Sequence, residues 1–474
     1  MIKASLIFQS TFAVKKWIME NRSKEEVLLA NGKISYLFRK FGIPGIVGLL
    51  FIGLQPIVDG LFLGNFMGAE AMAGINLFTP IYTFMSASAV VAGIGCQTIV
   101  SISLGEQKYQ RANNAFRTAF IFLTIYSIVI AAVSNIWAKE LSFLLGADEV
   151  LYPYATEYIR AFSPFFLFLT LVFLGDYILK ATGRPYSALS LLGLILLGNI
   201  TLDYLFIVEF SMGVKGAALA TGISLALSCI LMFAKLLKRK NIVKLQKGKF
   251  STRLLWEMLY NGSSSGVSEL SAGITVLLFN WIMMKNLGAD GVAALTAVNY
   301  LLYLGVQLFV GLSDGIIPII SYNYGAGNTQ RIRETLRLGF KSNAIIGCVF
   351  FTLIFFGGEF FIHLFFNEDG EGNINNILEI ARTGSKITAF AFFLNGANIL
   401  SSSFFTSRGD ALTSAIISFL RGLVLIVIGI AICPLLLGNN GIWLTIPLAE
   451  LITAFYCWFA FKKNVSWGVK IAKR

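Results

Sequence analysis

The chain has 474 residues, of which 56% are hydrophobic and only 13% are charged, and its formal net charge is +13. A soluble domain has roughly 25% charged residues. The composition therefore excludes an ordinary soluble globular protein and indicates a chain that lies mainly in a lipid bilayer.

Hydropathy along the chain predicts twelve membrane-spanning helices. Each predicted span has about 20 residues or more, which is enough to cross the hydrocarbon core of a bilayer. The apolar runs are continuous and do not alternate, so helices are expected and a transmembrane barrel is not. In chain order the predicted spans cover residues 42–66, 72–104, 113–135, 153–180, 186–208, 213–235, 254–286, 291–324, 338–360, 380–407, 411–434 and 441–461.

The positive residues indicate how these spans are oriented. If the N-terminus is cytoplasmic, most of the 38 Lys and Arg residues fall on the cytoplasmic side, as the positive-inside rule requires. We expect a multi-pass protein of the cytoplasmic (inner) membrane with both termini in the cytoplasm. The positive charge then sets topology and contacts anionic lipids, and no nucleic-acid partner is expected.

An internal repeat divides the chain into two halves. At an offset of 220 residues Gly68 aligns with Gly288, and at an offset of 225 residues Gly213 aligns with Gly438. Each half has six spans, so both halves have the same orientation in the membrane. The predicted fold is an all-α membrane protein of two six-helix bundles, related by a pseudo-twofold axis along the membrane normal.

The predicted organisation follows from this repeat. It consists of a cytoplasmic N-terminal lead (1–35), an N-terminal lobe (36–234), a basic cytoplasmic linker (235–253), a C-terminal lobe (254–463) and a cytoplasmic tail (464–474). Two parallel lobes around a central cleft suit alternating access, in which one lobe rocks against the other.

Polar residues within the N-terminal spans predict a functional pocket. A charge at mid-membrane costs roughly 2.5–3.5 kcal/mol on insertion scales, so each is a candidate for function. At a rise of 1.5 Å per residue, five groups lie at a similar depth below the outer surface. They are Asp59, Tyr158, Asn199, Asp203 and Thr221. Asn199 and Asp203 share one helix face because they are four residues apart.

Such a pocket has two chemical uses. Neighbouring carboxylates in a low-dielectric site do not both stay ionised easily, so the pair can carry a proton. Alternatively, oxygen atoms of Asp59, Asn199, Asp203 and Thr221 could hold Na⁺. The structural alternative is that these polar groups only join neighbouring helices. We predict no other metal site.

Further charged residues within the spans are candidates for the substrate cavity. The acids in this set are Glu269, Asp314 and Glu450. Arg421 lies mid-span and could neutralise one of them. Asp176 has Lys180 at i+4 near the inner interface, which predicts a structural ion pair with a snorkelling lysine.

The two halves differ in chemistry. The repeat partner of Asp59 is Phe279, and Gly429 lies near the partner position of Asp203. The C-terminal half therefore shares the scaffold but lacks the acid pair.

Motifs for ATP hydrolysis or enzyme catalysis are missing from the sequence. It contains no P-loop, no HExxH and no GxSxG with a plausible triad. We therefore expect neither an ATP-driven pump nor an enzyme, and no cofactor. The chain has 42 Phe, 16 Tyr and 7 Trp, and aromatic rings in a cleft would suit lipophilic cations.

Five segments carry a family resemblance. They are DGLFLG (59–64), GAEAMA (68–73), NITLD (199–203), GVKGAALAT (213–221) and PIISYNYGA (318–326). Together they resemble motifs of the multidrug and toxic compound extrusion (MATE) family, most closely its DinF-like branch. The resemblance extends over about residues 36–465. It implies that Asp59, Asn199 and Asp203 couple cation movement to transport, with Tyr158 and Thr221 as polar neighbours.

Two positions differ from the family pattern. Some members have Tyr one turn before the acid of the first span, where this chain has Gln55. Gln55 therefore bears on the hydrogen bonds around Asp59 and leaves the choice between H⁺ and Na⁺ open. Glu269 stands where related proteins can have a neutral polar residue, which implies a more acidic cavity.

The resemblance implies a monomeric, cation-coupled (H⁺ or Na⁺) antiporter that exports drug-like amphipathic or cationic compounds. The alternative is a lipid-linked saccharide flippase of the same superfamily, which would need a strongly cationic cavity. Away from the ends of the predicted spans, the positively charged residues are Arg160 and Arg421. A membrane-embedded enzyme is the third class, and it would need a catalytic cluster at the membrane face.

Overall fold

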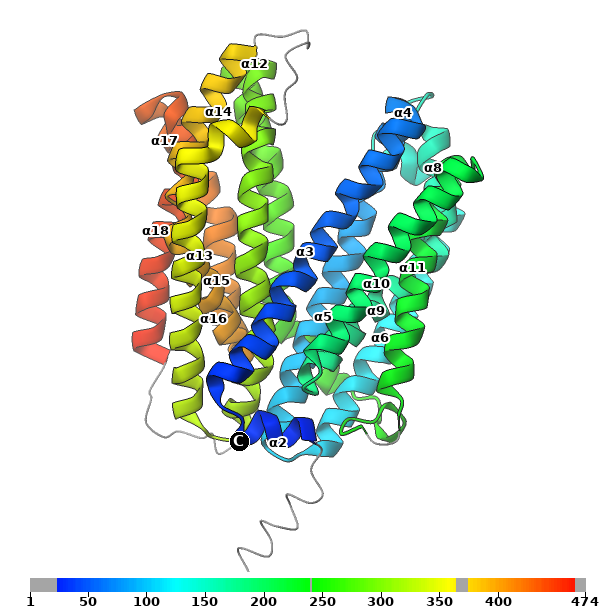
Figure 1. Cartoon of the computed structure of the whole chain (residues 1–474), viewed down its shortest axis with the longest axis vertical. Helices are drawn as coiled ribbons and strands as arrows, with labels where there is room; N and C mark the ends of the chain where they lie inside the picture. The colour runs from blue at the N-terminus through cyan, green and yellow to red at the C-terminus, as the bar shows by residue number, and fades with distance from the viewer. Residues whose placement is uncertain (1–23, 239–240, 364–373, 465–474) are drawn as a thin grey trace, which may run out of the picture.

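The computed structural model describes residues 24–238, 241–363 and 374–464, and all regular secondary structure in these ranges is helical. Figure 1 shows two helical lobes side by side, which meet at the lower end and diverge toward the upper end. The predicted all-α membrane fold is confirmed.

The N-terminal lobe contains six spans and two helices too short to cross a membrane. The spans are α3 (Ile34–Phe66), α4 (Gly68–Asn76) continued by α5 (Thr79–Gly105), α6 (Tyr109–Ile136), α8 (Tyr152–Phe162) continued by α9 (Phe166–Ala181), α10 (Pro185–Asp203) extended by a π-helical turn (Tyr204–Glu209), and α11 (Gly213–Leu236). The short helices are α2 (Lys24–Asn31) and α7 (Ala138–Leu144).

The C-terminal lobe repeats this arrangement. Its helices are α12 (Thr252–Gly325), α13 (Thr329–His363), α14 (Ile374–Ala389) with α15 (Phe392–Ser407), α16 (Ala411–Phe419) joined through a π-helical turn (Leu420–Val424) to α17 (Leu425–Leu437), and α18 (Asn439–Asn464). α14 and α15 are bent by 52° against each other and together make one span.

Helix α12 contains two spans. Its 74 residues would extend about 110 Å at a rise of 1.5 Å per residue, far more than the roughly 30 Å hydrocarbon core. Gly288 interrupts the helix with φ 64° and ψ −155°. Ten described helices are long and apolar enough to cross a membrane, and the bent pair adds one. Dividing α12 at Gly288 therefore gives the twelve predicted spans.

Two predicted helix starts were too late. The predictions 42–66 and 338–360 began well inside helices that start at Ile34 and Thr329. Hydropathy reports the lipid-crossing part of a helix, whereas these first turns are packed on other protein segments. Leu37 and Leu336, for example, are both buried.

The internal repeat recurs in the backbone. Gly68 and Gly288 have φ of 84° and 64°, and Gly213 and Gly438 have φ of 62° and 60°. Positive φ is readily adopted only by glycine. The glycines aligned in sequence therefore share a positive φ at corresponding places in the two lobes.

The lobes cross closely near their lower end. A Cβ atom on Gly105 of α5 would collide with the carbonyl oxygen of Tyr322, and one on Gly325 of α12 would collide with the carbonyl oxygen of Ile102. The two contacts are reciprocal because these residues correspond at the repeat offset. The pseudo-twofold axis therefore passes through this crossing.

Helix α2 lies beneath both lobes at the same end (Figure 1). Tyr109 of the N-terminal lobe donates a hydrogen bond to Glu26 at 2.7 Å. Arg331 of α13, in the C-terminal lobe, donates to the carbonyl oxygen of Leu29 at 3.1 Å. This helix therefore bridges the two lobes where they meet.

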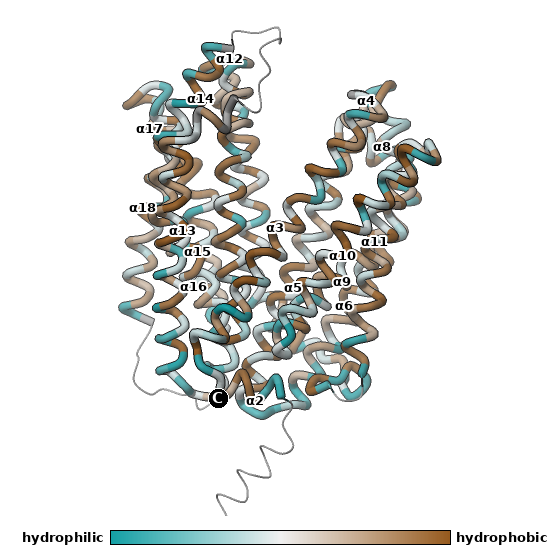
Figure 2. Tube along the Cα trace, viewed as in Figure 1, coloured by the Kyte–Doolittle hydropathy of each residue, from teal (hydrophilic) through white to brown (hydrophobic). Residues whose placement is uncertain are grey.

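The surface has the polarity of a membrane protein. Figure 2 shows mainly hydrophobic residues along the middle of the helices and hydrophilic residues gathered toward the lower end. Large apolar side chains such as Leu277, Phe356 and Leu435 are highly exposed. Lipid is the solvent that matches such a surface.

The lobe crossing predicts a stability effect. Gly105→Ala and Gly325→Ala should each destabilise the fold by about 1–3 kcal/mol, because the added methyl group forces the helices apart. Denaturant titration of the purified protein in detergent would measure this. Gly273→Ala is the matched control, since no atom lies within 4 Å of its added Cβ. Equal stability of all three variants would contradict the close crossing.

Candidate functional site

Two acids and an amide meet between helices of the N-terminal lobe. The side chain of Asp59 on α3 lies close to those of Asp203 and Asn199, both on α10, and interacts with them electrostatically. Asn199 also donates from Nδ2 to Oγ1 of Thr221 on α11, at 3.1 Å. Three separate helices thus place these four side chains in one cluster, which we call the acid cluster.

Local helix geometry positions these groups. Asp203 is the last α-helical residue of α10, directly before the π-helical turn Tyr204–Glu209. Asn199 lies one turn earlier on the same face, and both side chains are almost completely buried. In α3, Pro56 stands three residues before Asp59, where its missing N–H weakens the helix and permits a bend.

The acid cluster has more acceptors than donors. Both Oδ atoms of Asp203, one Oδ of Asp59 and Oδ1 of Asn199 are buried without a hydrogen-bond partner. Ionised carboxylates can only accept, so Asp59 and Asp203 can bond to each other only when one is protonated. The arrangement suits the uptake of one proton or one small cation.

Aromatic residues enclose the cluster. Tyr158 of α8 lies near Thr221 and interacts electrostatically with both acids. Its ring lies 5.0 Å from that of Phe78, centroid to centroid. Tyr82 of α5 also interacts electrostatically with Asp59. Sequence reasoning missed Tyr82, because a single tyrosine in an apolar span gives no signal of depth or partner.

A cavity lies beside the acid cluster. The space between its walls is about 720 Å³ when the open solvent at its mouth is included. Apolar side chains such as Phe51 and Phe173 line much of it. The polar lining residues are Gln55, Tyr82, Asp176, Tyr177, Lys180 and Asp314. Gln55 therefore faces this cavity from the turn of α3 that precedes Asp59.

The predicted substrate-cavity acids fall in two different places. Asp314 lines the cavity, and Glu269 interacts electrostatically with Asp314 and Tyr303. Glu450, in contrast, is buried within the C-terminal lobe and is not among the residues that line the cavity.

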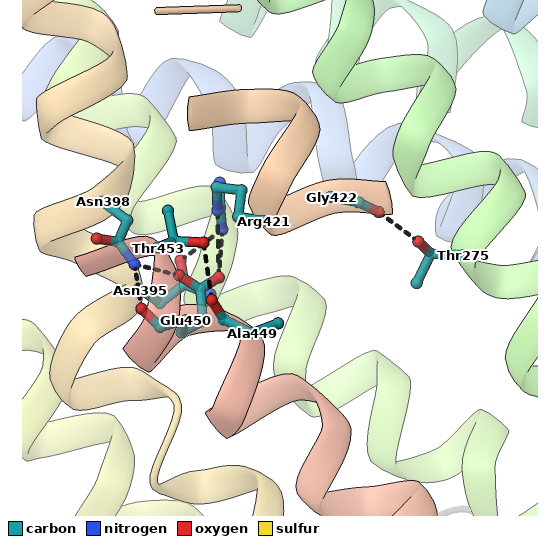
Figure 3. A network of polar contacts seen from close by, with 8 residues as sticks. All are labelled: Thr275, Asn395, Asn398, Arg421, Gly422, Ala449, Glu450 and Thr453. Atoms are coloured by element: carbon teal, nitrogen blue, oxygen red, sulfur yellow. Dashed lines mark hydrogen bonds and ion pairs between the residues drawn. The ribbon is translucent and has the colours of Figure 1, made fainter. Parts of the chain in front are cut away.

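Glu450 belongs to a closed polar network (Figure 3). Arg421 donates to Glu450 Oε1 from Nη2 at 2.9 Å and from Nε at 3.2 Å. Asn398 donates to Glu450 Oε2 at 2.7 Å, and Arg421 also donates to Asn395 at 3.1 Å. The structure thus identifies Glu450 as the acid that Arg421 neutralises.

The ion pair between Lys180 and Asp176 forms, with 2.6 Å between Nζ and Oδ2. The predicted snorkelling of Lys180 is wrong, however, because both side chains are buried. Lys180 is in the wall of the cavity instead of reaching the membrane interface. Among the described residues, no group of three or more His, Cys, Asp and Glu side chains is arranged to hold a metal ion.

Twelve spans in two parallel lobes, with buried charges facing a cavity, define a class of membrane transporters. The family model MatE matches residues 44–205 and 272–434, one segment in each lobe. The chain belongs to the MatE family of transporters and is not an enzyme. Its assignment to the DinF-like branch stays a prediction.

Individual relatives agree with this family. Multidrug export protein MepA of Staphylococcus haemolyticus is 24% identical over 426 residues, covering 88% of this chain and 91% of that protein. MepA of Staphylococcus aureus strain NCTC 8325 is 23% identical over 417 residues, covering 87% and 90%.

Solved structures share the fold. A MATE protein crystallised in a bent conformation has a TM-score of 0.86 and 23% identity, covering 94% of this chain and 98% of that one. A multidrug-resistance MATE transporter in an outward-facing conformation has a TM-score of 0.87 and 23% identity, covering 94% and 99%.

The Arg421–Glu450 pair predicts a stability effect. Glu450→Gln should destabilise the protein by about 1–3 kcal/mol, because it leaves the partly buried guanidinium of Arg421 without its carboxylate. Denaturant titration in detergent would measure this, with Glu334→Gln on the exposed surface of α13 as the control. A double variant, Arg421→Met with Glu450→Met, should recover most of the loss. A neutral Glu450→Gln would contradict the network.

Proposed function

We propose that this protein is a secondary active antiporter that exports drug-like amphipathic or cationic compounds in exchange for H⁺ or Na⁺. The observation that supports this most is the acid cluster. Asp59 and Asp203 face each other in a buried site with more acceptors than donors. One cation satisfies such a site, and its binding and release change the local charge by one unit.

In an alternating-access cycle, this change of charge would drive the movement of one lobe against the other. The lobes are separate bundles that diverge at one end and cross closely at the other (Figure 1). With the predicted cytoplasmic termini, the open end faces outward. Pro44 and Pro56 lie within α3, the helix that brings Asp59 to the cluster. A bend in α3 therefore links cation binding to the lobe interface.

The energy of a cation gradient is sufficient to drive export of a compound against its own gradient. Each unit charge that moves inward through 100 mV supplies about 2.3 kcal/mol, equivalent to more than a tenfold concentration ratio of an exported compound. No ATP-binding motif is needed. The names of the MepA relatives as multidrug export proteins support drug-like compounds as the substrate class.

The coupling ion is either H⁺ or Na⁺. A proton requires only the two carboxyl groups, whereas Na⁺ would take oxygen atoms from Asp59, Asn199, Asp203 and Thr221. Gln55 and Tyr158 serve as the polar neighbours of this site. The protein works as a monomer in the inner membrane, with lipid as its other partner.

The flippase alternative gains no support from the cavity. A lipid pyrophosphate requires several free cationic side chains. Lys180 is the one Lys or Arg among the described residues that line the cavity, and it is paired with Asp176.

Loss of either acid should remove transport. Asp59→Asn and Asp203→Asn should each reduce cation-driven efflux by about tenfold or more, because an amide does not exchange a proton and holds Na⁺ weakly. The measurement is ethidium efflux from proteoliposomes under separate H⁺ and Na⁺ gradients. The gradient that drives the wild type identifies the coupling ion.

The matched control for these variants is Asp290→Asn, near the outer turn at Gly288, where Asp290 accepts a hydrogen bond from Asn376. It should transport like the wild type. Both cluster variants should also be as stable as the wild type, since they remove repulsion between acids. Wild-type efflux from either one would refute coupling at this site.

A further inference from the structure

The cavity beside the acid cluster extends from neighbours of Asp59 to a second set of charged residues. Gln55 and Tyr82 line the cavity, and both are neighbours of Asp59, one along α3 and the other through electrostatic interaction. The same cavity is lined by Asp176 and Lys180 of α9 and by Asp314 of α12. We call these last three residues the inner charge set. The cavity thus borders the inner charge set directly and reaches Gln55 and Tyr82, which are neighbours of the acid cluster.

The inner charge set spans the two lobes. Asp176 and Lys180 belong to the N-terminal lobe, whereas Asp314 belongs to the C-terminal lobe and interacts electrostatically with both of them. Asp314 also accepts a hydrogen bond from Ser403 at 3.3 Å. A movement of one lobe against the other therefore changes the distances within this set.

The inner charge set has fewer positive groups than carboxyl groups. Lys180 supplies one ammonium group against the carboxyl groups of Asp176 and Asp314, and Glu269 adds a further acid that interacts with Asp314. The cavity residues contributed by α3, α10 and α11 are all uncharged. Among the described residues that line the cavity, Lys180 is the one with a positive charge to balance the acids.

One oxygen of this set has no partner. Lys180 donates to Oδ2 of Asp176, but Oδ1 of Asp176 is buried without a hydrogen-bond partner. A role in stability alone explains the Asp176–Lys180 pair poorly, because apolar residues can often replace a buried ion pair without loss of folding stability. An unpartnered carboxylate oxygen in a cavity wall instead suits an exchangeable cation.

We infer that Asp176, Lys180 and Asp314 form a second station for the coupling cation, used when it leaves the acid cluster toward the inner side. The inference rests on the proposed cation coupling at Asp59 and Asp203. The cation, H⁺ or Na⁺, moves through the cavity to the free oxygen of Asp176. The ammonium group of Lys180 keeps its binding there weak enough for release.

The test uses the full chain in proteoliposomes and ethidium efflux under an H⁺ or a Na⁺ gradient. Asp176→Asn should slow cation-driven efflux by about tenfold or more. The double variant Asp176→Asn with Lys180→Gln removes the ion pair without leaving an unpaired charge. It should be as slow as the single variant, because it also lacks the carboxylate. Asp290→Asn is the control and should transport like the wild type.

A second measurement separates release from binding. In detergent, cation-dependent intrinsic tryptophan fluorescence would report loading of the acid cluster. The half-maximal cation concentration of both variants should stay within about threefold of the wild type, whereas Asp59→Asn should lose the response.

The outcomes distinguish the two ideas. If the wild type shows no cation-driven efflux, the proposed function itself fails. If the wild type is coupled and the double variant recovers wild-type efflux, the pair is only structural and the second station is refuted. If the double variant loses the fluorescence response together with efflux, the inner charge set supports the acid cluster instead of releasing its cation, which also refutes the inference.

Discussion

The facing carboxyl groups of Asp59 and Asp203 are the interaction on which the rest of this molecule depends. Packing three helices around two acids and an amide places several buried acceptors where the surrounding described side chains offer them no donor. In a low-dielectric interior such a group is unfavourable until a cation or proton joins it. The surrounding lobe, with its rings at Tyr158 and Tyr82, holds the acids together in spite of that cost.

The C-terminal lobe also buries a carboxylate, but it balances the negative charge in a different way. Its polar network joins α15, α18 and the turn before α17, the repeat counterparts of α9, α11 and α10 in the N-terminal lobe. There Arg421 supplies a covalently attached positive charge to Glu450, so this network is complete without an ion from outside. The two lobes therefore share a helical arrangement, but this C-terminal network contains its own positive charge and the acid cluster of the N-terminal lobe does not.

Much of this could be predicted from the sequence. Twelve spans and the parallel repeat follow from hydropathy and from aligned glycines, because bilayer thickness and positive φ are strong local constraints. Depth along the helices also selected the members of the acid cluster, which the structure brings together. The directions in which side chains point could not be predicted from the sequence. Tyr82 was missed as a neighbour of the acid cluster, and Lys180 was expected at the membrane interface although it is buried in a cavity wall. Those outcomes depend on how helices are rotated against each other, which spacing along one chain does not encode.

Helix α2 has a consequence for how the lobes can move. It accepts a hydrogen bond from Tyr109 in one lobe and another from Arg331 in the other, and Glu25 also faces Arg184 at 3.5 Å. An eight-residue helix is rigid and cannot lengthen, so separation of the lobes at this end must break its contacts on one side. The segment before the first span therefore ties the two lobes together where they meet. Under the proposed alternating access, it would have to release one lobe in every transport cycle.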